Sequence, residues 1–179
     1  KEDSSFPNFD RVAADLIERY GGISNLQLAP NAVISKIFPL KGNELAVGLD
    51  LKKNQRAVAA IEAKELTVEG PFNLMQGGIS VVGRYPVFLK ENKVGEEKFW
   101  GFTTALIELA PLLALVDIHG LVAKNYHFKL FNAVSKIVDQ KIIAQSSDEI
   151  LENPVSVDIQ VPNGKWTLSI SPKSGWYPF

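Results

Sequence analysis

Few residues of this chain have the types and spacing that catalysis or metal binding requires. His119 and His127 are the only histidines, and no HExxH motif or acidic triad accompanies them. A metal site needs three or four converging ligands, so two ordinary histidines explain this pair better. Asp148, Glu149 and Glu152 lie close together, but their spacing suits a solvated helix face or loop rather than paired catalytic carboxylates. The sequence therefore predicts no metal centre and no catalytic residues.

The glycine-rich run from Gly77 to Gly83 also departs from the motifs it resembles. Ser80 stands where a dinucleotide-binding fingerprint needs its second glycine, and a strand rather than a helix is expected to follow. Val82 replaces the last glycine of a nucleophile elbow. A turn or bulge before a strand explains these glycines better. We expect no enzyme activity and no cofactor in this chain.

Arg84 is the charged residue that most needs an explanation. It interrupts an otherwise apolar stretch, directly before Tyr85 and Pro86. An arginine there must either point to solvent or find an acidic or ligand partner in the interior. Structural roles are favoured over ligand contact.

The elements that must position Arg84 form the centre of the predicted fold. Two apolar runs, Ile79–Leu89 and Phe99–Glu108, are each long enough to be a strand that crosses a domain. Between them lie Asn92, Gly95 and several charged residues, which cannot be buried cheaply and so predict an exposed loop. The sequence thus predicts a central antiparallel hairpin.

The residues before the hairpin predict a mixture of helices and strands. An apolar stripe with helical spacing predicts a helix over Phe9–Tyr20, which Gly21 and Gly22 end. Asn54 is placed to cap a second helix. The other expected elements are strands over Ile23–Leu28, Ala32–Phe38 and Ala46–Leu51 and the capped helix over Gln55–Lys64.

The residues after the hairpin predict a short helix and then mostly strands. Pro111 suits the first turn of a helix that ends near Gly120. Pro162 to Lys165 is a strong hairpin-turn signal between two runs of alternating apolar and polar residues. The expected strands are Asn125–Phe131, Lys141–Ser146, Val155–Val161 and Trp166–Ser171. They either extend the first sheet or form a second one.

Together these elements predict an α/β fold of the α+β type, with antiparallel sheets. We expect a single domain over residues 1–179, with a soft boundary near 117–124 between a core at 1–116 and a strand-rich part at 125–179. A parallel doubly wound sheet is not expected.

Composition limits the partners of the chain. It has 179 residues, of which 46% are hydrophobic, a net charge of -1 and no cysteine. These values describe a globular protein without a global attraction to nucleic acid or to an anionic membrane surface. The most apolar window, Ala105–Ile118, is interrupted by Glu108, Pro111 and Asp117 and is a poor membrane span. We expect the chain to be an excised piece of a longer protein, whose membrane anchors lie outside it.

Four runs of residues resemble one known family. They are LAPNAVISKIFPLKGNELAVGLDL, GPFNLMQGGISVVGRYPVF, FWGFTTALIELAPLL and NGKWTLSISPKSGW, in this order. The ordered set resembles the CHASE domain, the extracellular or periplasmic sensor module of receptor histidine kinases and of diguanylate cyclases or phosphodiesterases. GGISVVGRYPVF followed by FWGF carries most of the likeness.

The resemblance implies a PAS-like antiparallel sheet with a long N-terminal helix and flanking membrane helices. It implies a membrane-bound receptor that passes a small-molecule signal from the periplasmic or extracellular side to a cytoplasmic output domain, and a homodimer formed through the N-terminal helix. The plant members contact cytokinins through an acidic residue, near whose place this chain has Lys41, Asn43 and Glu44. Cytokinin specificity is therefore not expected here. A module that signals by protein contact, without a small ligand, is the alternative.

If the hairpin is the centre of such a sheet, its alternate residues face opposite sides, so the ligand side includes Arg84 or Tyr85 but hardly both. Aromatic walls with few polar groups are typical of small-molecule sites, and glycines leave room beside them. The same residues would close into a dry core if no pocket existed. The predicted pocket residues are Phe72, Leu74, Gly83, Tyr85, Gly101 and either Phe102 or Thr103, with Asp50 or Arg84 at the rim.

Overall fold

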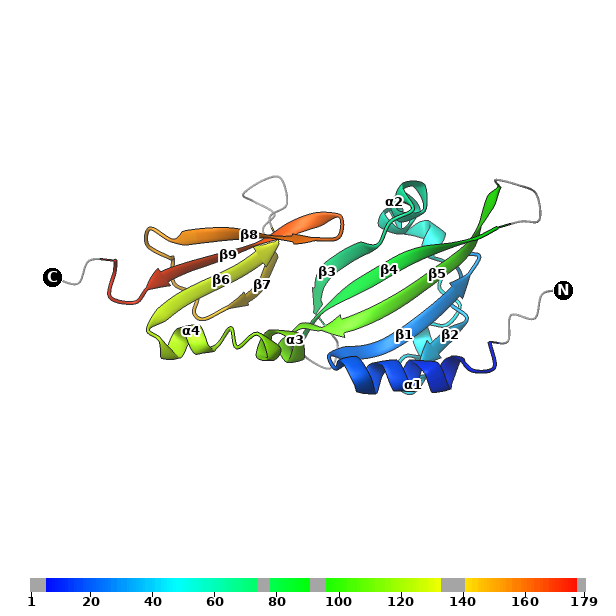
Figure 1. Ribbon diagram of the computed structural model, residues 1–179, viewed down its shortest axis with the longest axis horizontal. Coiled ribbons are helices and arrows are strands. Elements are labelled where there is room, and N and C mark those ends of the chain that lie inside the picture. Colours follow the sequence, from blue (N-terminus) through cyan, green and yellow to red (C-terminus); the bar gives the residue numbers. More distant parts are fainter. Residues whose placement is uncertain (1–5, 74–77, 91–95, 133–140, 177–179) are drawn as a thin grey trace. The chain divides into compact units, whose positions relative to one another are not determined.

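The computed structural model describes residues 6–73, 78–90, 96–132 and 141–176 of the chain (Figure 1). They form two compact units. The first contains residues Lys1–Gly70 and Val81–Glu108, and the second contains Pro71–Ser80 and Leu109–Phe179.

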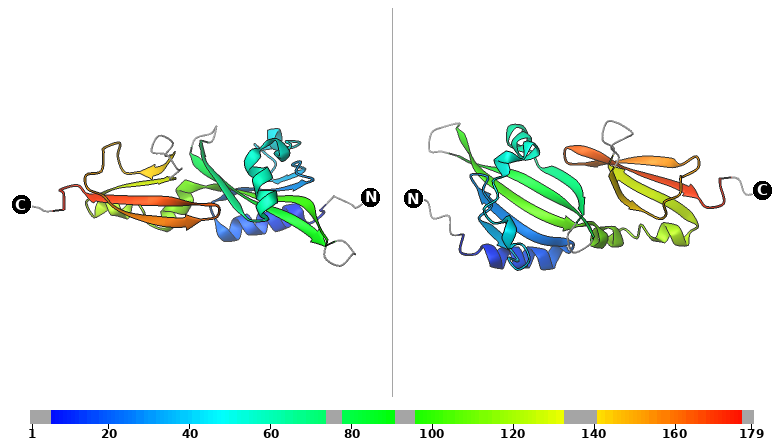
Figure 2. Two further views of the ribbon diagram at one scale, coloured as in Figure 1. Left: turned by 90° about the horizontal axis from the view of Figure 1, so that it is seen from above. Right: turned by 180° about the vertical axis from the view of Figure 1, so that it is seen from behind.

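The first unit begins with helix α1, Phe9–Tyr20, as the apolar stripe predicts. Ala13 is the residue of this helix that is buried, and the helix runs beside strands β1 (Ile23–Pro30) and β2 (Lys36–Phe38) (Figures 1 and 2). Val12 and Tyr20 remain 46% and 62% exposed, so part of the apolar stripe stays outside the fold.

The first unit also contains a five-stranded sheet with the order β2-β1-β5-β4-β3. Its remaining strands are β3 (Thr67–Asn73), β4 (Ile79–Lys90) and β5 (Glu97–Glu108). The predicted central hairpin is confirmed as β4 and β5, which run in opposite directions beside each other (Figure 1). β1 pairs antiparallel with both β2 and β5. The α+β prediction with an antiparallel sheet is therefore confirmed.

Helix α2, Gln55–Ala63, covers part of this unit's core. Asn54 caps the helix as predicted, because its Oδ1 accepts hydrogen bonds from Arg56 N at 2.8 Å and Ala57 N at 3.3 Å. Ala57 and Ala60 are fully buried, and their small side chains allow the helix to lie close to the strands. The core contains Ala29, Ala32, Ile34, Ile37, Leu51, Ala57, Ala60 and Phe102.

The segment between β1 and α2 differs from the expected pair of strands. Asn31 and Ala32 have φ angles of 53° and 66°, which turn the chain, so the expected strand over Ala32–Phe38 is shortened to Lys36–Phe38. The expected strand over Ala46–Leu51 is wrong.

In its place the chain makes two short 3-10 turns, η1 over Glu44–Ala46 and η2 over Leu51–Lys53. Gly48 lies between them with a φ of 87°, a conformation that a strand cannot use. The apolar residues of this segment alternate as in a strand, but the glycine bends the backbone.

The second unit contains helix α3 (Leu109–Leu115), helix α4 (Gly120–Ala123) and a separate four-stranded sheet with the order β7-β6-β9-β8. Its strands are β6 (Tyr126–Asn132), β7 (Lys141–Gln145), β8 (Val155–Val161) and β9 (Gly164–Pro172). β6 pairs antiparallel with β7 and β9, and β8 pairs antiparallel with β9. The C-terminal strands thus form a second sheet, one of the two predicted arrangements.

On β9 the buried residues are those with hydroxyl groups rather than the apolar ones. Thr167, Ser169 and Ser171 are at most 9% exposed, and each hydroxyl has a hydrogen-bond partner. Thr167 Oγ1 donates to Asp158 at 2.8 Å, and Lys165 Nζ lies 2.5 Å from the same carboxylate. Hydrogen bonds from Lys165 and then Thr167 hold the pKa of Asp158 below its usual value.

Candidate ligand-binding site

The first unit contains a buried ion pair between Arg84 on β4 and Glu69 on β3. Arg84 is 6% and Glu69 4% exposed, and Arg84 Nη1 is bonded to Glu69 Oε1. A buried charge is tolerated only when it is paired. The sequence left three possibilities for Arg84, namely solvent, an acidic partner or a ligand, and the structure shows the acidic partner. Such pairs add little stability compared with apolar residues of the same size.

The cap of helix α2 is tied to this ion pair. Asn54 Nδ2 donates to Glu69 Oε2 at 3.2 Å while its Oδ1 caps the helix. Each carboxylate oxygen of Glu69 therefore has a donor, one from a strand and one from a helix terminus. Asn54 therefore connects the ion pair to the N-terminus of α2.

Polar residues continue from the ion pair across the sheet. The guanidinium carbon of Arg84 lies 5.9 Å from the ring centroid of Phe102 on β5, so both side chains are on one face. Thr104, two residues farther along β5, shares that face and is directly opposite Gln27 of β1. We call Gln27, Thr104, Arg84 and Glu69 the polar row. It crosses four of the five strands.

One end of the polar row is fixed by amide hydrogen bonds. Gln27 Nε2 donates to Asn25 Oδ1 at 2.9 Å, and Asn25 Nδ2 donates to Asn43 Oδ1 at 3.1 Å. Asn43 Nδ2 in turn donates to the carbonyl of Pro39 at 2.9 Å. The loop after β2 is thereby attached to the same face as the ion pair.

Three buried side-chain atoms have no hydrogen-bond partner among the described residues: Ser80 Oγ, Arg84 Nε and Thr104 Oγ1. The last two belong to the polar row, and Arg84 and Thr104 are only 6% and 4% exposed. Buried polar groups almost always have a partner, since leaving one unpaired costs about 1–3 kcal/mol. A free N–H donor and a free hydroxyl on one face of a sheet are the kind of polar groups that orient a small molecule in a ligand site.

Of the predicted pocket residues, the structure places Arg84 and Phe102 together on the polar row's face. Tyr85 and Thr103 are exposed and alternate with these two buried residues along their strands. The prediction that Arg84 and Tyr85 do not share a side is therefore confirmed. Phe102 is fully buried in the core, in edge-to-face contact with Phe99 at 5.2 Å.

The other predicted residues have different positions. Asp50 accepts a hydrogen bond from Lys52 N at 3.0 Å, so it caps the turn η2. Phe72 lies near the end of β3 and is 40% exposed, and Leu74 lies outside the described residues. A side chain at Gly83 would meet only the carbonyl oxygen of Ala105, at 3.9 Å, so there is room beside this residue.

The room expected at Gly101 does not exist. A Cβ added there would lie 2.2 Å from the carbonyl oxygen of Ala29 and 2.8 Å from Pro30 Cα. Gly101 permits the close approach of β1 and β5 and does not open a cavity. The prediction that Gly101 leaves room for a ligand is therefore wrong.

Sequence reasoning missed Glu69, Asn54 and Thr104 as members of this site. Glu69 had a signal, because it is a carboxylate between Val68 and Gly70 in a strand-like run that leads into the central hairpin. Thr104 had none, since a threonine is common in strands on either face.

Among the described residues there is no group of three or more His, Asp or Glu that could hold a metal ion. None of the described helices is long and apolar enough to span a membrane.

Comparison with known proteins agrees with this fold. One similar solved structure is an extracellular ligand binding receptor from Desulfohalobium retbaense, with a TM-score of 0.64 and 10% sequence identity. The match covers 90% of this chain and 32% of that receptor, so this chain spans about a third of the other protein. At this identity the likeness concerns the fold. No curated protein matches the chain.

The family model of the CHASE domain matches residues 10–139, which is most of the chain. This protein belongs to the CHASE domain family. It is a sensor domain of the extracellular or periplasmic side, and the CHASE domain itself is not catalytic.

Proposed function

We propose that this domain senses a small polar molecule bound on the polar row of the first unit. The observation that carries the proposal is the pair of buried atoms without a partner, Arg84 Nε and Thr104 Oγ1. Arg84 Nε–H would donate to an acceptor of the ligand, and the Thr104 hydroxyl would donate or accept. Phe102 lies on the same face, with its ring centroid 5.9 Å from the guanidinium carbon of Arg84, so the ligand would bind beside an aromatic residue.

Thr104→Val separates this proposal from a purely structural role. Valine has nearly the same shape without the hydroxyl, so the unliganded domain should be as stable as the wild type or more stable by about 1 kcal/mol, because an unpaired buried hydroxyl is removed. Metabolites found to raise the Tm of the wild-type domain in a thermal-shift screen should lose most of that effect on the variant. In the intact receptor, the output activity should stop responding to them.

Thr103→Val is the matched control. Thr103 is the neighbouring residue on β5, but it is exposed on the other side of the strand, so the response to ligand should be retained. A ligand that stabilises Thr104→Val as strongly as the wild type would show that the site is not on the polar row. Marked destabilisation of Thr104→Val would show that the hydroxyl has a structural partner.

We further propose that the domain is part of a membrane-bound receptor that passes this signal to a cytoplasmic histidine kinase or cyclic-di-GMP output domain. Membership of the CHASE family supports this arrangement. The tie between Glu69 and the Asn54 cap offers a route, because ligand contact with Arg84 would alter the ion pair and with it the anchoring of α2.

A homodimer formed through α1 is the proposed signalling assembly. Val12 and Tyr20 on this helix stay exposed although they belong to its apolar stripe. The chain contains no cysteine, so Val12→Cys in the intact receptor would provide a single thiol on that stripe. We expect oxidation to give a covalent dimer with Val12→Cys and not with Glu18→Cys, an exposed position elsewhere on α1. Equal cross-linking at both positions, or none at Val12, would contradict pairing through the stripe.

An interaction module without a small ligand is the second candidate function. The observation in its favour is the exposed apolar side of β8, where Val155, Val157 and Ile159 are 57%, 55% and 40% exposed at the edge of the second sheet. Exposed apolar side chains on an edge strand are typical of protein contact surfaces. The ligand screen distinguishes the two functions, since an interaction module would show no stabilisation that depends on Thr104.

A further inference from the structure

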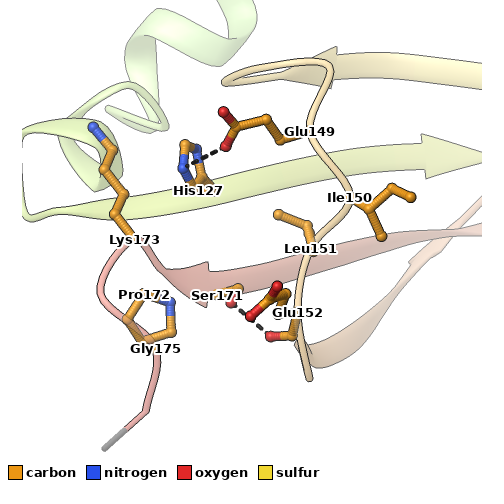
Figure 3. A pocket seen from close by; sticks show the side chains of 9 residues that line it. All are labelled: His127, Glu149, Ile150, Leu151, Glu152, Ser171, Pro172, Lys173 and Gly175. Atoms are coloured by element: carbon orange, nitrogen blue, oxygen red, sulfur yellow. Dashed lines mark hydrogen bonds and ion pairs between the residues drawn. The ribbon is translucent and has the colours of Figure 1, made fainter. Parts of the chain in front are cut away.

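The second unit contains a polar cavity of about 190 Å³ between β6, β9 and the loop after β7 (Figure 3). It is large enough for several water molecules and therefore for a small metabolite. Its polar lining includes His127, Glu149, Glu152, Ser171 and Lys173. It lies entirely within the second unit and is independent of the polar row.

One wall of the cavity is fixed by His127. Its Nε2 is 3.2 Å from Glu149 Oε2, and its Nδ1 is 3.2 Å from Ser147 Oγ and 3.4 Å from Ser146 Oγ. Ser146 Oγ also accepts a hydrogen bond from Phe128 N at 2.9 Å. Both ring nitrogens of His127 are thus engaged, and Glu149 already has a partner.

Two further hydrogen bonds hold the loop over the sheet. The buried hydroxyl of Ser171 on β9 donates to the carbonyl of Glu152 at 2.7 Å. Trp176 Nε1 donates to the carbonyl of Asn153 at 2.8 Å. The loop and the segment after β9 therefore form a preformed cavity rather than two independent surfaces.

Glu152 and Lys173 are the charged residues of the cavity that remain available. Within the part of the chain that the structure describes, neither side chain makes an ion pair or a side-chain hydrogen bond. They line the cavity from different segments, Glu152 from the loop after β7 and Lys173 from the segment directly after β9 (Figure 3). A carboxylate and an ammonium group that line one cavity without pairing offer complementary charges to a molecule that carries both.

We propose that this cavity is a second ligand site, which binds a compact amino-acid-like zwitterion with its ammonium group at Glu152 and its carboxylate at Lys173. A simple anion would be repelled by Glu149 and Glu152, and a simple amine would be repelled by Lys173. The two recognising side chains are exposed to solvent, so binding should weaken as the salt concentration rises.

The test is an NMR titration of the 179-residue chain with glycine, L-alanine and L-serine. Propionate and ethylamine serve as controls, because each corresponds to L-alanine without one of its charged groups. We expect saturable shifts of the amides of Glu152, Lys173 and Gly175 with at least one amino acid, and at least tenfold weaker binding of both controls. Glu152→Gln and Lys173→Met should each weaken binding about tenfold, whereas Lys165→Met, which removes an exposed lysine paired with Asp158, should not.

Three results would overturn the proposal. They are the absence of saturable shifts at this cavity with all three amino acids, binding of propionate or ethylamine as tight as that of L-alanine, and unchanged binding by folded Glu152→Gln and Lys173→Met. Shifts confined to amides of the first unit would report the polar row and would likewise reject this second site. The ligand response that depends on Thr104 is measured separately and is unaffected by any of these outcomes.

Discussion

Replacement of Glu69 by alanine is expected to lower the free energy of unfolding by about 3–5 kcal/mol. The substitution leaves the buried guanidinium of Arg84 without its carboxylate, and it also removes the acceptor of Asn54 Nδ2. Both groups would then lose their partners while water cannot reach them freely. Chemical denaturation followed by circular dichroism measures the loss.

The exposed ion pair of Lys64 and Glu97 is the matched control. Its charged atoms are 3.0 Å apart, but the two side chains are 54% and 44% exposed. Solvent screens such a pair, so Glu97→Ala should cost at most about 1 kcal/mol. A Glu69→Ala variant as stable as Glu97→Ala would mean that Arg84 finds another partner or reaches solvent.

The double variant Glu69→Met/Arg84→Met separates stability from function. Apolar residues of similar volume often replace a buried ion pair without loss of stability. We therefore expect this variant to recover most of the stability that Glu69→Ala loses. It should still fail to respond to ligands of the polar row, because the donor Nε–H of Arg84 is absent. Retention of the ligand response would show that the ion pair has only a structural role.

The sequence shows that Arg84 needs an explanation, but it does not reveal the partner. A charged residue in an apolar strand is visible in any reading of the chain, whereas its pairing with Glu69 depends on the register between β3 and β4. A shift of one residue would turn either side chain to the opposite face. The same limit applies to Thr104. The face of the sheet on which its side chain lies becomes known only from its pairing with Gln27.

Local patterns were reliable where they were long and continuous. The helical stripe of α1 and the two long strands of the hairpin are confirmed with nearly the expected ends. The segment from Ala46 to Leu51 failed because its alternating apolar residues imitate a strand, while Gly48 and the cap formed by Asp50 produce turns. The sequence also left open whether the C-terminal strands join the first sheet, since strand order is decided by contacts between distant residues.

Gly101→Ala is the second substitution for which we expect a large effect. The added Cβ would lie 2.2 Å from the carbonyl oxygen of Ala29 and 2.8 Å from Pro30 Cα, and neither backbone atom can move without separating β1 from β5. The φ of 156° at Gly101 is also unfavourable for alanine. Overpacking and backbone strain together should cost about 3–5 kcal/mol.

Gly83→Ala gives the corresponding control on the neighbouring strand. There the added Cβ would meet only the carbonyl oxygen of Ala105, at the ordinary contact distance of 3.9 Å. We expect its free energy of unfolding to stay within about 1 kcal/mol of the wild type, because a residue with a Cβ suits a strand better than glycine. If Gly101→Ala were as stable as Gly83→Ala, β1 and β5 could not approach as closely as the structure shows, and the space first expected at Gly101 would exist after all.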